Sequence, residues 1–211
     1  MNGDSPAQRP DDAGRSTGAG EGASREPRRA ERVVLDDVAI RRALVRIAHE
    51  IVERNEDLAS LYLVGIPNGG VPLARQLAQN LEEVADQGVV LGSLDTTLYR
   101  DDLIAGARPR LRRTEMPSAV DDRVVILVDD VASTGRTIRA AMDALMDFGR
   151  PRAVQVVALV DRGHRELPIR IDYVGKNIPT RRGERVQFRS LGGGTEGPFE
   201  VVVLADEGGE R

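Results

Sequence analysis

The chain has 211 residues, long enough for one sizeable domain and too short for two of ordinary size. It has no cysteine, which excludes disulfides, and only two histidines, which argues against a zinc site. Its formal net charge of -4 leaves a local basic patch as the way it could bind nucleic acid. The longest apolar runs hold five residues and no secretory signal opens the chain, so we expect a soluble, cytoplasmic protein with no membrane partner.

The first part of the chain lacks the residues that build a core. From Asn2 to Arg32 there is no Val, Ile, Leu or aromatic side chain, and acidic residues balance arginines over 1–30. Such a segment cannot bury enough apolar surface to order itself, so we expect residues 1–32 to be a disordered extension, or alternatively an RNA tether. The folded domain should span 33–205, with a short tail at 206–211.

The first predicted helix has one apolar and one basic face. After a cap at Asp36 or Asp37, the apolar side chains recur at helical spacing. They are Ile40, Leu44, Ile47 and Ile51, and the opposite face carries Arg42, Arg46, His49 and Glu53.

The rest of the chain alternates between strand and helix patterns. In order, we expect a strand at 61–64, a Gly/Pro/Asn turn, a helix from about 71, a strand-like stretch at 89–99, an Arg- and Pro-rich mobile loop at 100–120, a strand at 124–128, a loop at 129–135, a helix through 148, and strands at 153–160, 185–190 and 200–204. This alternation predicts an α/β fold with a largely parallel central sheet flanked by helices.

The most informative segment is the apolar strand that ends in Asp129 and Asp130. Parallel sheets place their ligands at this end of a strand. Small residues follow, at the expected start of a helix, where backbone N–H groups can bind an anion, and hydroxyls at Thr134 and Thr137 add donors. Adjacent carboxylates beside a phosphate cradle suit a ribose 5-phosphate. The alternative is that the two aspartates only cap the helix; a Walker A loop is excluded by the spacing and the absent lysine.

This segment resembles the signature of type I phosphoribosyltransferases, which bind 5-phosphoribosyl-1-pyrophosphate (PRPP). The resemblance implies their fold, with a small hood and a mobile loop. It implies that Asp129 and Asp130 hold the ribose hydroxyls, with Mg²⁺ carried by PRPP near them and no direct metal site. The 5-phosphate would lie on Val131, Ala132, Ser133, Thr134, Gly135, Arg136 and Thr137.

Three further segments are similar to the PyrR family of pyrimidine-operon regulators. They are Ile40–Glu50, Leu98–Leu103, and Leu159–Arg170 together with Gly175–Thr180. The resemblance implies uracil phosphoribosyltransferase activity, forming UMP and pyrophosphate, and binding of a pyr leader mRNA hairpin in response to UMP or UTP. It also implies a homodimer or homotetramer. The alternatives are an RNA-binding regulator with little turnover, or a transferase for another base.

Two positions depart from the family's pattern. Its Thr-Arg-Gly pyrophosphate turn reads Asn68-Gly69-Gly70 here, which removes one charge-assisted contact worth about 1.5–3 kcal/mol. We therefore expect Gly69→Arg to raise transferase activity. The pair Ala132-Ser133 is smaller than the pair that is usual in the family.

The resemblance also assigns residues outside the phosphate loop. Arg100 is a candidate pyrophosphate contact, and the backbone around Val160 and Asp161 would read the base. Any of four loop arginines could close over the site or simply be solvated: Arg108, Arg110, Arg112 and Arg113.

A local excess of positive charge stands out in the late part of the chain. Residues 161–185 hold seven cationic and four acidic side chains. The family's RNA-binding positions correspond to Arg46, His49, Arg165, Arg170 and Lys176. A solvated basic face is the alternative. If these residues bind RNA and take no part in binding PRPP, the double change Arg165→Ala with Lys176→Ala should weaken RNA binding and leave uracil transfer nearly intact.

Overall fold

The computed structural model describes residues 31–101, 111–193 and 197–205. The expectations for 1–30 and 206–211, and those for Arg108 and Arg110, therefore lie outside the described residues. The elements, with 3-10 turns marked η, are β1 (Glu31–Leu35), α1 (Asp37–Arg54), η1 (Leu58–Ser60), β2 (Leu61–Gly65), α2 (Gly70–Ala85), β3 (Val90–Ser93), η2 (Thr97–Tyr99), β4 (Val124–Ala132), α3 (Arg136–Leu145), η3 (Met146–Phe148), β5 (Ala153–Asp161), β6 (Tyr173–Asn177), β7 (Arg185–Ser190) and β8 (Phe199–Leu204).

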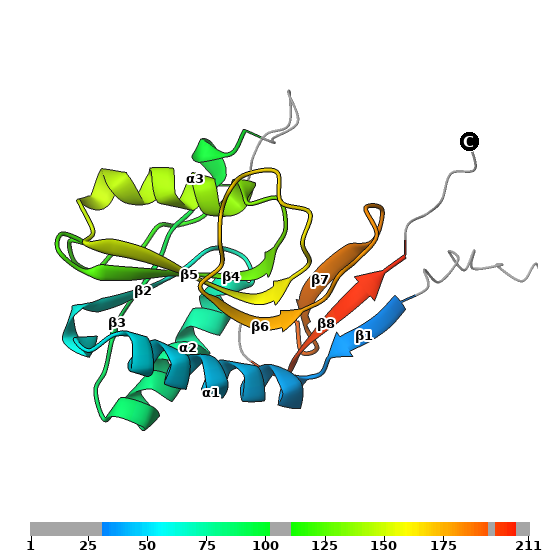
Figure 1. Ribbon diagram of the computed structural model, residues 1–211, viewed down its shortest axis with the longest axis horizontal. Coiled ribbons are helices and arrows are strands. Elements are labelled where there is room, and N and C mark those ends of the chain that lie inside the picture. Colours follow the sequence, from blue (N-terminus) through cyan, green and yellow to red (C-terminus); the bar gives the residue numbers. More distant parts are fainter. Residues whose placement is uncertain (1–30, 102–110, 194–196, 206–211) are drawn as a thin grey trace, which may run out of the picture.

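A five-stranded sheet with the order β3-β2-β4-β5-β6 forms the centre of the fold (Figure 1). All four strand pairs are parallel, which confirms the predicted α/β class. The central strand β4 lies between β2 and β5, so the loops that follow these two strands flank the loop that follows β4. This arrangement brings the Asn68 turn and the segment after Asp161 to opposite sides of the phosphate loop.

Helices cover both faces of this sheet. Figure 1 shows α1 and α2 on one face and α3 on the other. Alternate residues of β2 separate accordingly: Leu61 and Leu63 pack into the core under α1 and α2, whereas Tyr62 and Val64 pack with the core of α3. The predicted apolar face of α1 is buried, and the Asp36 side chain caps this helix by accepting from Ala39 N at 2.8 Å. Burial on both faces explains why the strands are almost wholly apolar.

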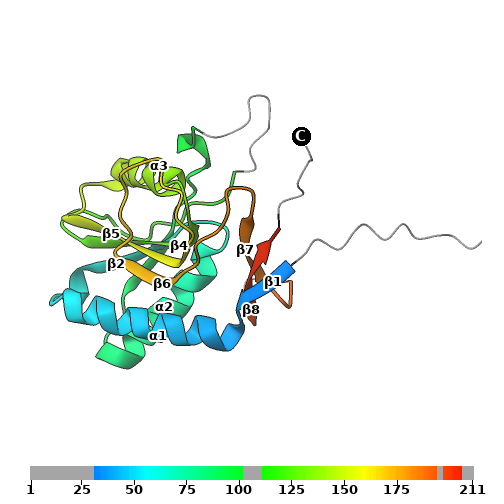
Figure 2. The ribbon, with the colours of Figure 1, turned by 45° about the vertical axis from the view of Figure 1, so that its right-hand side comes forward.

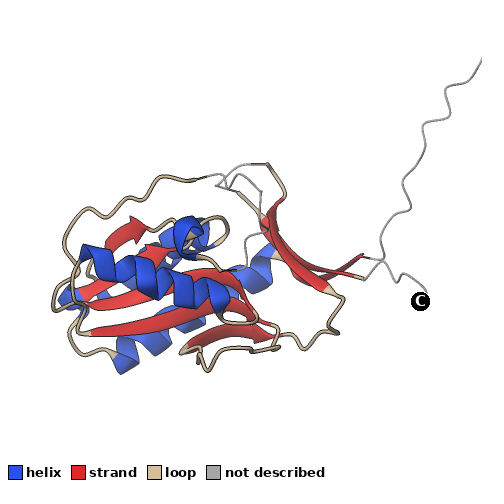
Figure 3. Cartoon of the chain, turned by 90° about the horizontal axis from the view of Figure 1, so that it is seen from above, coloured by secondary structure: helices blue, strands red, loops and turns tan. Residues whose placement is uncertain are grey.

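The hood is a separate three-stranded antiparallel sheet with the order β1-β8-β7. It stands at one end of the central sheet (Figures 2 and 3). Asp37 ties it to α1 by accepting from Phe199 N at 3.0 Å. The first strand starts at Glu31, two residues before the expected domain start, because Glu31 pairs through its backbone with Leu204 and through its carboxylate with Arg189.

Two strand ends and one whole strand differ from the sequence-based expectations. β4 runs on to Ala132, because β5 pairs with it as far as Asp161, so Asp129 and Asp130 lie in a strand and not in a loop. β3 ends at Ser93 and a 3-10 turn follows, where one long strand was expected. β6 was not predicted, since its residues include glycine and lysine and half of it is exposed. Within the described residues, no helix is both long and apolar enough to cross a bilayer.

Candidate active site

Two carboxylates lie at the carboxyl end of β4. Asp129 is buried, with 5% of its surface exposed, and its Oδ1 accepts from Asp130 N at 3.0 Å. Asp130 is partly exposed, and its own Oδ1 accepts from Val131 N at 3.0 Å. Asp129 therefore stabilises the backbone turn from within, and Asp130 is the carboxylate that can meet a ligand.

The buried carboxyl of Asp129 has a perturbed acidity. Burial raises the pKa of Asp129 well above its ordinary value of 3.8, and the adjacent Asp130 carboxylate raises it further. The Arg100 guanidinium acts in the opposite direction with a smaller effect. A cation beside the pair, whether a side chain or a ligand-borne metal, would favour the ionised form of Asp129.

Asp129→Asn is expected to stabilise the ligand-free protein at pH 8. Because the folded-state pKa is raised, the carboxyl's contribution is full below pH 3.8 and is lost as the pH rises through the folded-state pKa. Asparagine keeps the acceptor for Asp130 N and cannot ionise. We expect a higher Tm than that of the wild type at pH 8 and little difference near pH 4. A Tm difference that does not change with pH would contradict this assignment.

The phosphate loop leads from β4 into α3. Gly135 has a φ of 92°, a left-handed conformation that favours glycine, and it precedes the first helical residue Arg136. The first N–H groups of α3 have no carbonyl partner inside the helix. Thr134 Oγ1 accepts from Arg136 N at 3.3 Å, and the Thr134 carbonyl accepts from Glu166 N and Leu167 N. The loop is thus fixed from outside while its N–H groups remain available for an anion.

An open cleft lies beside the carboxylates. It runs between the turn after β2, the end of β4 and the hood strand β7. Its lining includes Asn68, Gly69, Arg112, Asp130, Val131 and Phe188. Asn68 and Gly69 of the predicted pyrophosphate turn face this cleft. Of the two predicted loop arginines that the structure describes, Arg112 reaches the cleft and Arg113 pairs with Glu115. The contribution of β7, including Phe188, was not predicted, because nothing in its sequence marks it as facing the cleft.

The glycines of the turn after β2 allow a close approach to β4. A Cβ on Gly70 would overlap the Val128 carbonyl oxygen, and a Cβ on Gly69 would lie 2.6 Å from the Asp130 Cβ and Cγ. This close contact argues against the sequence-based expectation that Gly69→Arg raises activity, because a side chain at this position requires the Asp130 side chain or the turn to shift.

Arg100 reaches the phosphate loop from the other direction. It follows η2, and its Nη1 donates to Thr137 Oγ1 at 3.2 Å. It is also close enough to Asp129 to affect its pKa. Arg100 thus lies between the loop hydroxyl and the carboxylate pair, which fits a contact with the phosphates of a ligand.

Arg165 fastens the phosphate loop to the segment after β5. Its Nη1 donates to the Ser133 carbonyl at 2.6 Å, and its guanidinium forms a two-point ion pair with Asp161 at 3.0 and 2.6 Å. Its Nε donates to the Ile169 carbonyl at 3.1 Å. The sequence-based separation of Arg165 from the PRPP site does not hold, because this side chain holds the loop.

Arg165→Gln is expected to raise the KM for PRPP about tenfold. The change removes a two-point, charge-assisted contact and frees the Ser133 carbonyl, so the phosphate loop becomes less ordered before ligand binding. Initial-rate kinetics with varied PRPP would measure this. The exposed Arg170 forms no hydrogen bond or ion pair with the described residues, so Arg170→Gln is the matched control. An unchanged KM in both variants would contradict the role given to Arg165.

The positions expected to read the base are tied into the fold. The Val160 side chain is fully buried, and its backbone pairs with β4 and β6. The Asp161 carbonyl accepts from Ile178 N at 2.8 Å, and its carboxylate is held by Arg165 and by Gly163 N. The contact of these two positions with a base stays a prediction.

Three of the predicted RNA-binding residues, Arg46, His49 and Lys176, lie on α1 and β6, which are neighbours in the fold. Arg46 donates to the carbonyls of Val174 and Gly175 at 2.9 and 2.8 Å, which places it beside Lys176 on the same strand. His49 is exposed one turn further along α1, and Arg170 is exposed just before β6. Figures 1 and 2 both show α1 beside β6. The structure thus brings Arg46 close to Lys176, although the two are far apart in the sequence. That these residues bind RNA stays a prediction.

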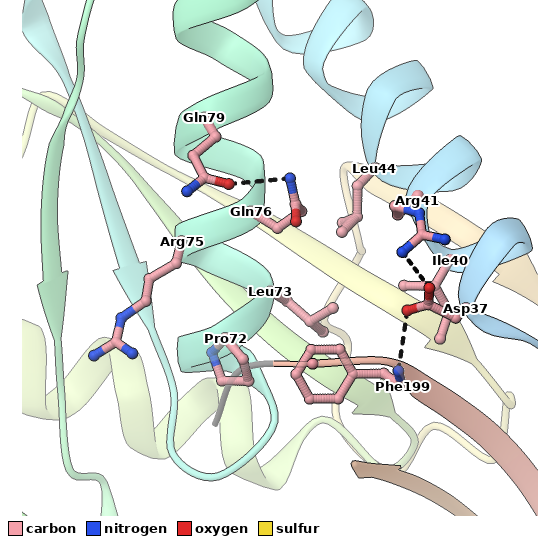
Figure 4. Close-up of a pocket in the computed structure, with 11 residues that line it drawn as sticks. Asp37, Ile40, Arg41, Leu44, Pro72, Leu73, Arg75, Gln76, Gln79 and Phe199 are labelled. Atoms are coloured by element: carbon pink, nitrogen blue, oxygen red, sulfur yellow. Dashed lines mark hydrogen bonds and ion pairs between the residues drawn. The ribbon is translucent and has the colours of Figure 1, made fainter. Parts of the chain in front are cut away.

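A second groove lies between α1, α2 and the start of β8 (Figure 4). Asp37 pairs there with Arg41 and accepts from Phe199 N. None of the predicted site residues line this groove. It adjoins the cleft beside Asp130, since Pro72 and Phe199 line both.

The fold and the site together match known proteins of one class. Residues 33–190 match the family model of the phosphoribosyl transferase domain. A hypoxanthine phosphoribosyltransferase from Trypanosoma cruzi, solved as a ternary complex with substrates, superposes with a TM-score of 0.64 at 19% identity, covering 85% of this chain and 97% of that one. A hypoxanthine phosphoribosyltransferase from Staphylococcus aureus superposes with a TM-score of 0.57 at 20% identity, covering 70% and 77%. The structure is a type I phosphoribosyltransferase fold.

Curated relatives identify the branch of this class. The bifunctional protein PyrR of Roseiflexus sp. (strain RS-1) is 54% identical over 181 residues, which cover 84% of this chain and 99% of the relative. The bifunctional protein PyrR of Bacillus subtilis (strain 168) is 54% identical over 160 residues, covering 74% and 88%. The chain belongs to the PyrR family.

Proposed function

We propose that this protein transfers the phosphoribosyl group of PRPP to uracil, and that it binds a pyr leader mRNA hairpin in response to uridine nucleotides. The observation that carries the enzymatic part is the meeting of Asp130, the phosphate loop and the Gly69 turn around one open cleft. Family membership supports uracil as the acceptor and the regulatory second role.

The order of the strands supports a particular orientation of PRPP. With the ribose at Asp130 and the 5-phosphate on 131–137, the pyrophosphate would face the turn after β2, where Asn68, Arg112 and the N–H groups of the Gly-Gly turn can donate. The segment after β5 lies on the other side of β4. A base held there would meet C1 of the ribose opposite the leaving group, as an in-line displacement requires.

The protein's own residues hold and screen the reactants in this reaction. Positive charge builds on the ribose and negative charge on the leaving pyrophosphate, so donors around the pyrophosphate lower the barrier. Mg²⁺ would arrive on PRPP, near the carboxylates of Asp129 and Asp130 at the end of β4. When bound, Mg²⁺ neutralises charge on the leaving group.

The direct test of the enzymatic part is product formation from PRPP with different bases. Uracil should give UMP and pyrophosphate in equal amounts, whereas hypoxanthine should give neither. Turnover with hypoxanthine and none with uracil would favour a transferase for another base.

The seam between α1 and β6 supports the RNA-binding role. Arg46, His49 and Lys176 lie along it, and Arg170, exposed just before β6, forms no hydrogen bond or ion pair with the described residues. Cations free of internal partners can contact phosphates of a hairpin. We exclude Arg165 from this surface, because its guanidinium is occupied by Ser133 and Asp161.

Arg170→Gln with Lys176→Gln is expected to weaken leader-RNA binding and to flatten its dependence on salt. Each lost phosphate contact lowers the slope of log K against log salt by about 0.7–0.9. Uracil transfer should stay nearly intact, since neither residue contacts the cleft. RNA titrations at several salt concentrations would measure the slope. An unchanged slope, or a loss of transfer, would contradict the seam as an RNA surface.

A regulator with little turnover is the second candidate, and one observation favours it. The turn after β2 carries Gly69 where the resembling family has an arginine, so one charged contact with pyrophosphate is absent. Tight binding of PRPP or UMP with no measurable product would favour a regulator with little turnover over an active transferase. In either case the nucleotides and mRNA bound are cytoplasmic, which is where we place the protein. The expected homodimer or homotetramer stays a prediction.

A further inference from the structure

The segment from Thr97 to Arg112 begins and ends at one side chain, that of Asp95. Asp95 lies between β3 and η2 and is partly buried. Its Oδ1 accepts from Thr97 N at 2.9 Å and from Thr97 Oγ1 at 2.5 Å, where the segment begins. Its Oδ2 accepts from Arg112 N at 2.5 Å, where the segment ends. One carboxylate thus fixes both ends of this stretch of chain.

Backbone contacts hold Asp95 beside the central sheet. Ser93 and Glu115 exchange two backbone hydrogen bonds, at 2.9 and 2.8 Å. Leu94 N donates to the Gly65 carbonyl at 3.2 Å, which ties the same stretch to the end of β2. Since β2 leads directly into the turn that lines the cleft, Asp95 is a fixed point relative to that cleft.

The two contacts of Asp95 depend on its charge. Burial raises the pKa of Asp95, but the hydrogen bonds from Thr97 and Arg112 have the larger combined effect and keep the pKa below its ordinary value of 3.8. The side chain is therefore an ionised carboxylate at neutral pH, with two oxygens that accept and no donor. Asparagine offers a single acceptor oxygen, so it cannot hold both ends of the segment.

The two ends of the segment depend on Asp95 to different degrees. The first end is also held by α3, because Arg139 Nη2 donates to the Tyr99 carbonyl at 2.9 Å. At the second end the Asp95 carboxylate holds the backbone of Arg112, and Arg112 lines the cleft. Loss of the carboxylate should therefore displace Arg112 more than Arg100, which follows Tyr99.

We propose that Asp95 is a positioning residue that holds Arg112 toward the pyrophosphate of PRPP. The proposal rests on the proposed function, because it takes the cleft beside Asp130 as the PRPP site. Asp95 acts through the backbone of Arg112 and not by contact with a reactant. Position and charge have opposite effects here: removal of a negative charge near the cleft would by itself strengthen binding of the anionic PRPP, whereas release of Arg112 weakens it.

The test measures PRPP and UMP binding by calorimetry, without uracil. Asp95→Asn should weaken PRPP binding about five- to tenfold, because a misplaced charged contact is largely lost. The affinity for UMP, which has no pyrophosphate, should change less than about twofold, since its phosphate is held by the loop after β4. Asp121 offers the matched control: its carboxylate accepts from Arg150 N at 2.8 Å near the amino end of β4, and Asp121→Asn should leave both affinities unchanged.

A double-mutant cycle shows whether Asp95 acts through Arg112. Arg112→Gln should itself weaken PRPP binding, and the addition of Asp95→Asn should cost less than about a further twofold, because the side chain that Asp95 positions is already gone. Losses that simply multiply would overturn the proposal. Unchanged or tighter PRPP binding in Asp95→Asn, or equal losses for PRPP and UMP, would overturn it too and leave the transferase site in place. A wild-type protein that binds neither PRPP nor UMP would instead overturn the proposed function.

Discussion

Asp130→Asn is expected to lower kcat/KM for PRPP-dependent uracil transfer about 100-fold. Asp130 is the carboxylate of the β4 pair that faces the cleft, and the asparagine removes its charge beside the ribose and the substrate-borne metal. The side chain keeps its shape and its acceptor for Val131 N, so the fold should be unaffected. Steady-state kinetics with varied PRPP would measure the loss.

A control variant at an exposed carboxylate shows whether the loss comes from the charge at Asp130 or from any change in the protein's net charge. Asp143 lies on the exposed part of α3 and pairs with Arg139 at 3.0 Å. Asp143→Asn should leave the kinetics within about twofold, because exposed ion pairs contribute little. Unchanged kinetics in Asp130→Asn would move the active site away from β4.

Gly69→Arg is expected to lower transfer about 100-fold, although it restores the residue found in the resembling family. Its Cβ would lie 2.6 Å from the Asp130 Cβ and Cγ, so either the turn or the carboxylate must move. A displacement of about 1 Å in a reacting site can cost about 100-fold in rate. PRPP binding by calorimetry and transfer rates on the same preparation would measure the two effects separately.

Asn68 offers the comparison for this variant. It lines the same cleft and is exposed, whereas Gly69 is buried against the Asp130 side chain. Asn68→Arg should therefore add a cation near the pyrophosphate without displacing Asp130, and its activity should equal or exceed that of the wild type. A gain in Gly69→Arg together with a loss in Asn68→Arg would contradict the packing argument.

The phosphate loop and the class of fold could be predicted from sequence, because their signals are local. An apolar strand, two aspartates, small residues and a helix follow one another in the chain, and backbone physics fixes what they form. The apolar stripe of α1 was predictable for the same reason. The late strands β7 and β8 were also predicted, but their joining with β1 into a hood depends on pairing across most of the chain.

The residues whose surroundings the sequence could not show are those whose role depends on packing. Gly69 could be read as a missing charge, and only the position of Asp130 beside it shows why a glycine stands there. Arg165 could be read as a surface cation, yet its side chain turns to Ser133 and Asp161. Arg162 and Arg182 belong to the cationic excess of residues 161–185, but the pocket that they share forms where two loops meet and has no local sequence signal.

The central claim is that this cleft joins uracil to the phosphoribosyl group of PRPP. The most direct measurement incubates the protein with PRPP, Mg²⁺ and labelled uracil and follows UMP and pyrophosphate together. The account predicts equal formation of both products, about 100-fold slower in Asp130→Asn, and none when hypoxanthine replaces uracil. PRPP that binds without forming UMP, or UMP formation that does not change in Asp130→Asn, would contradict it.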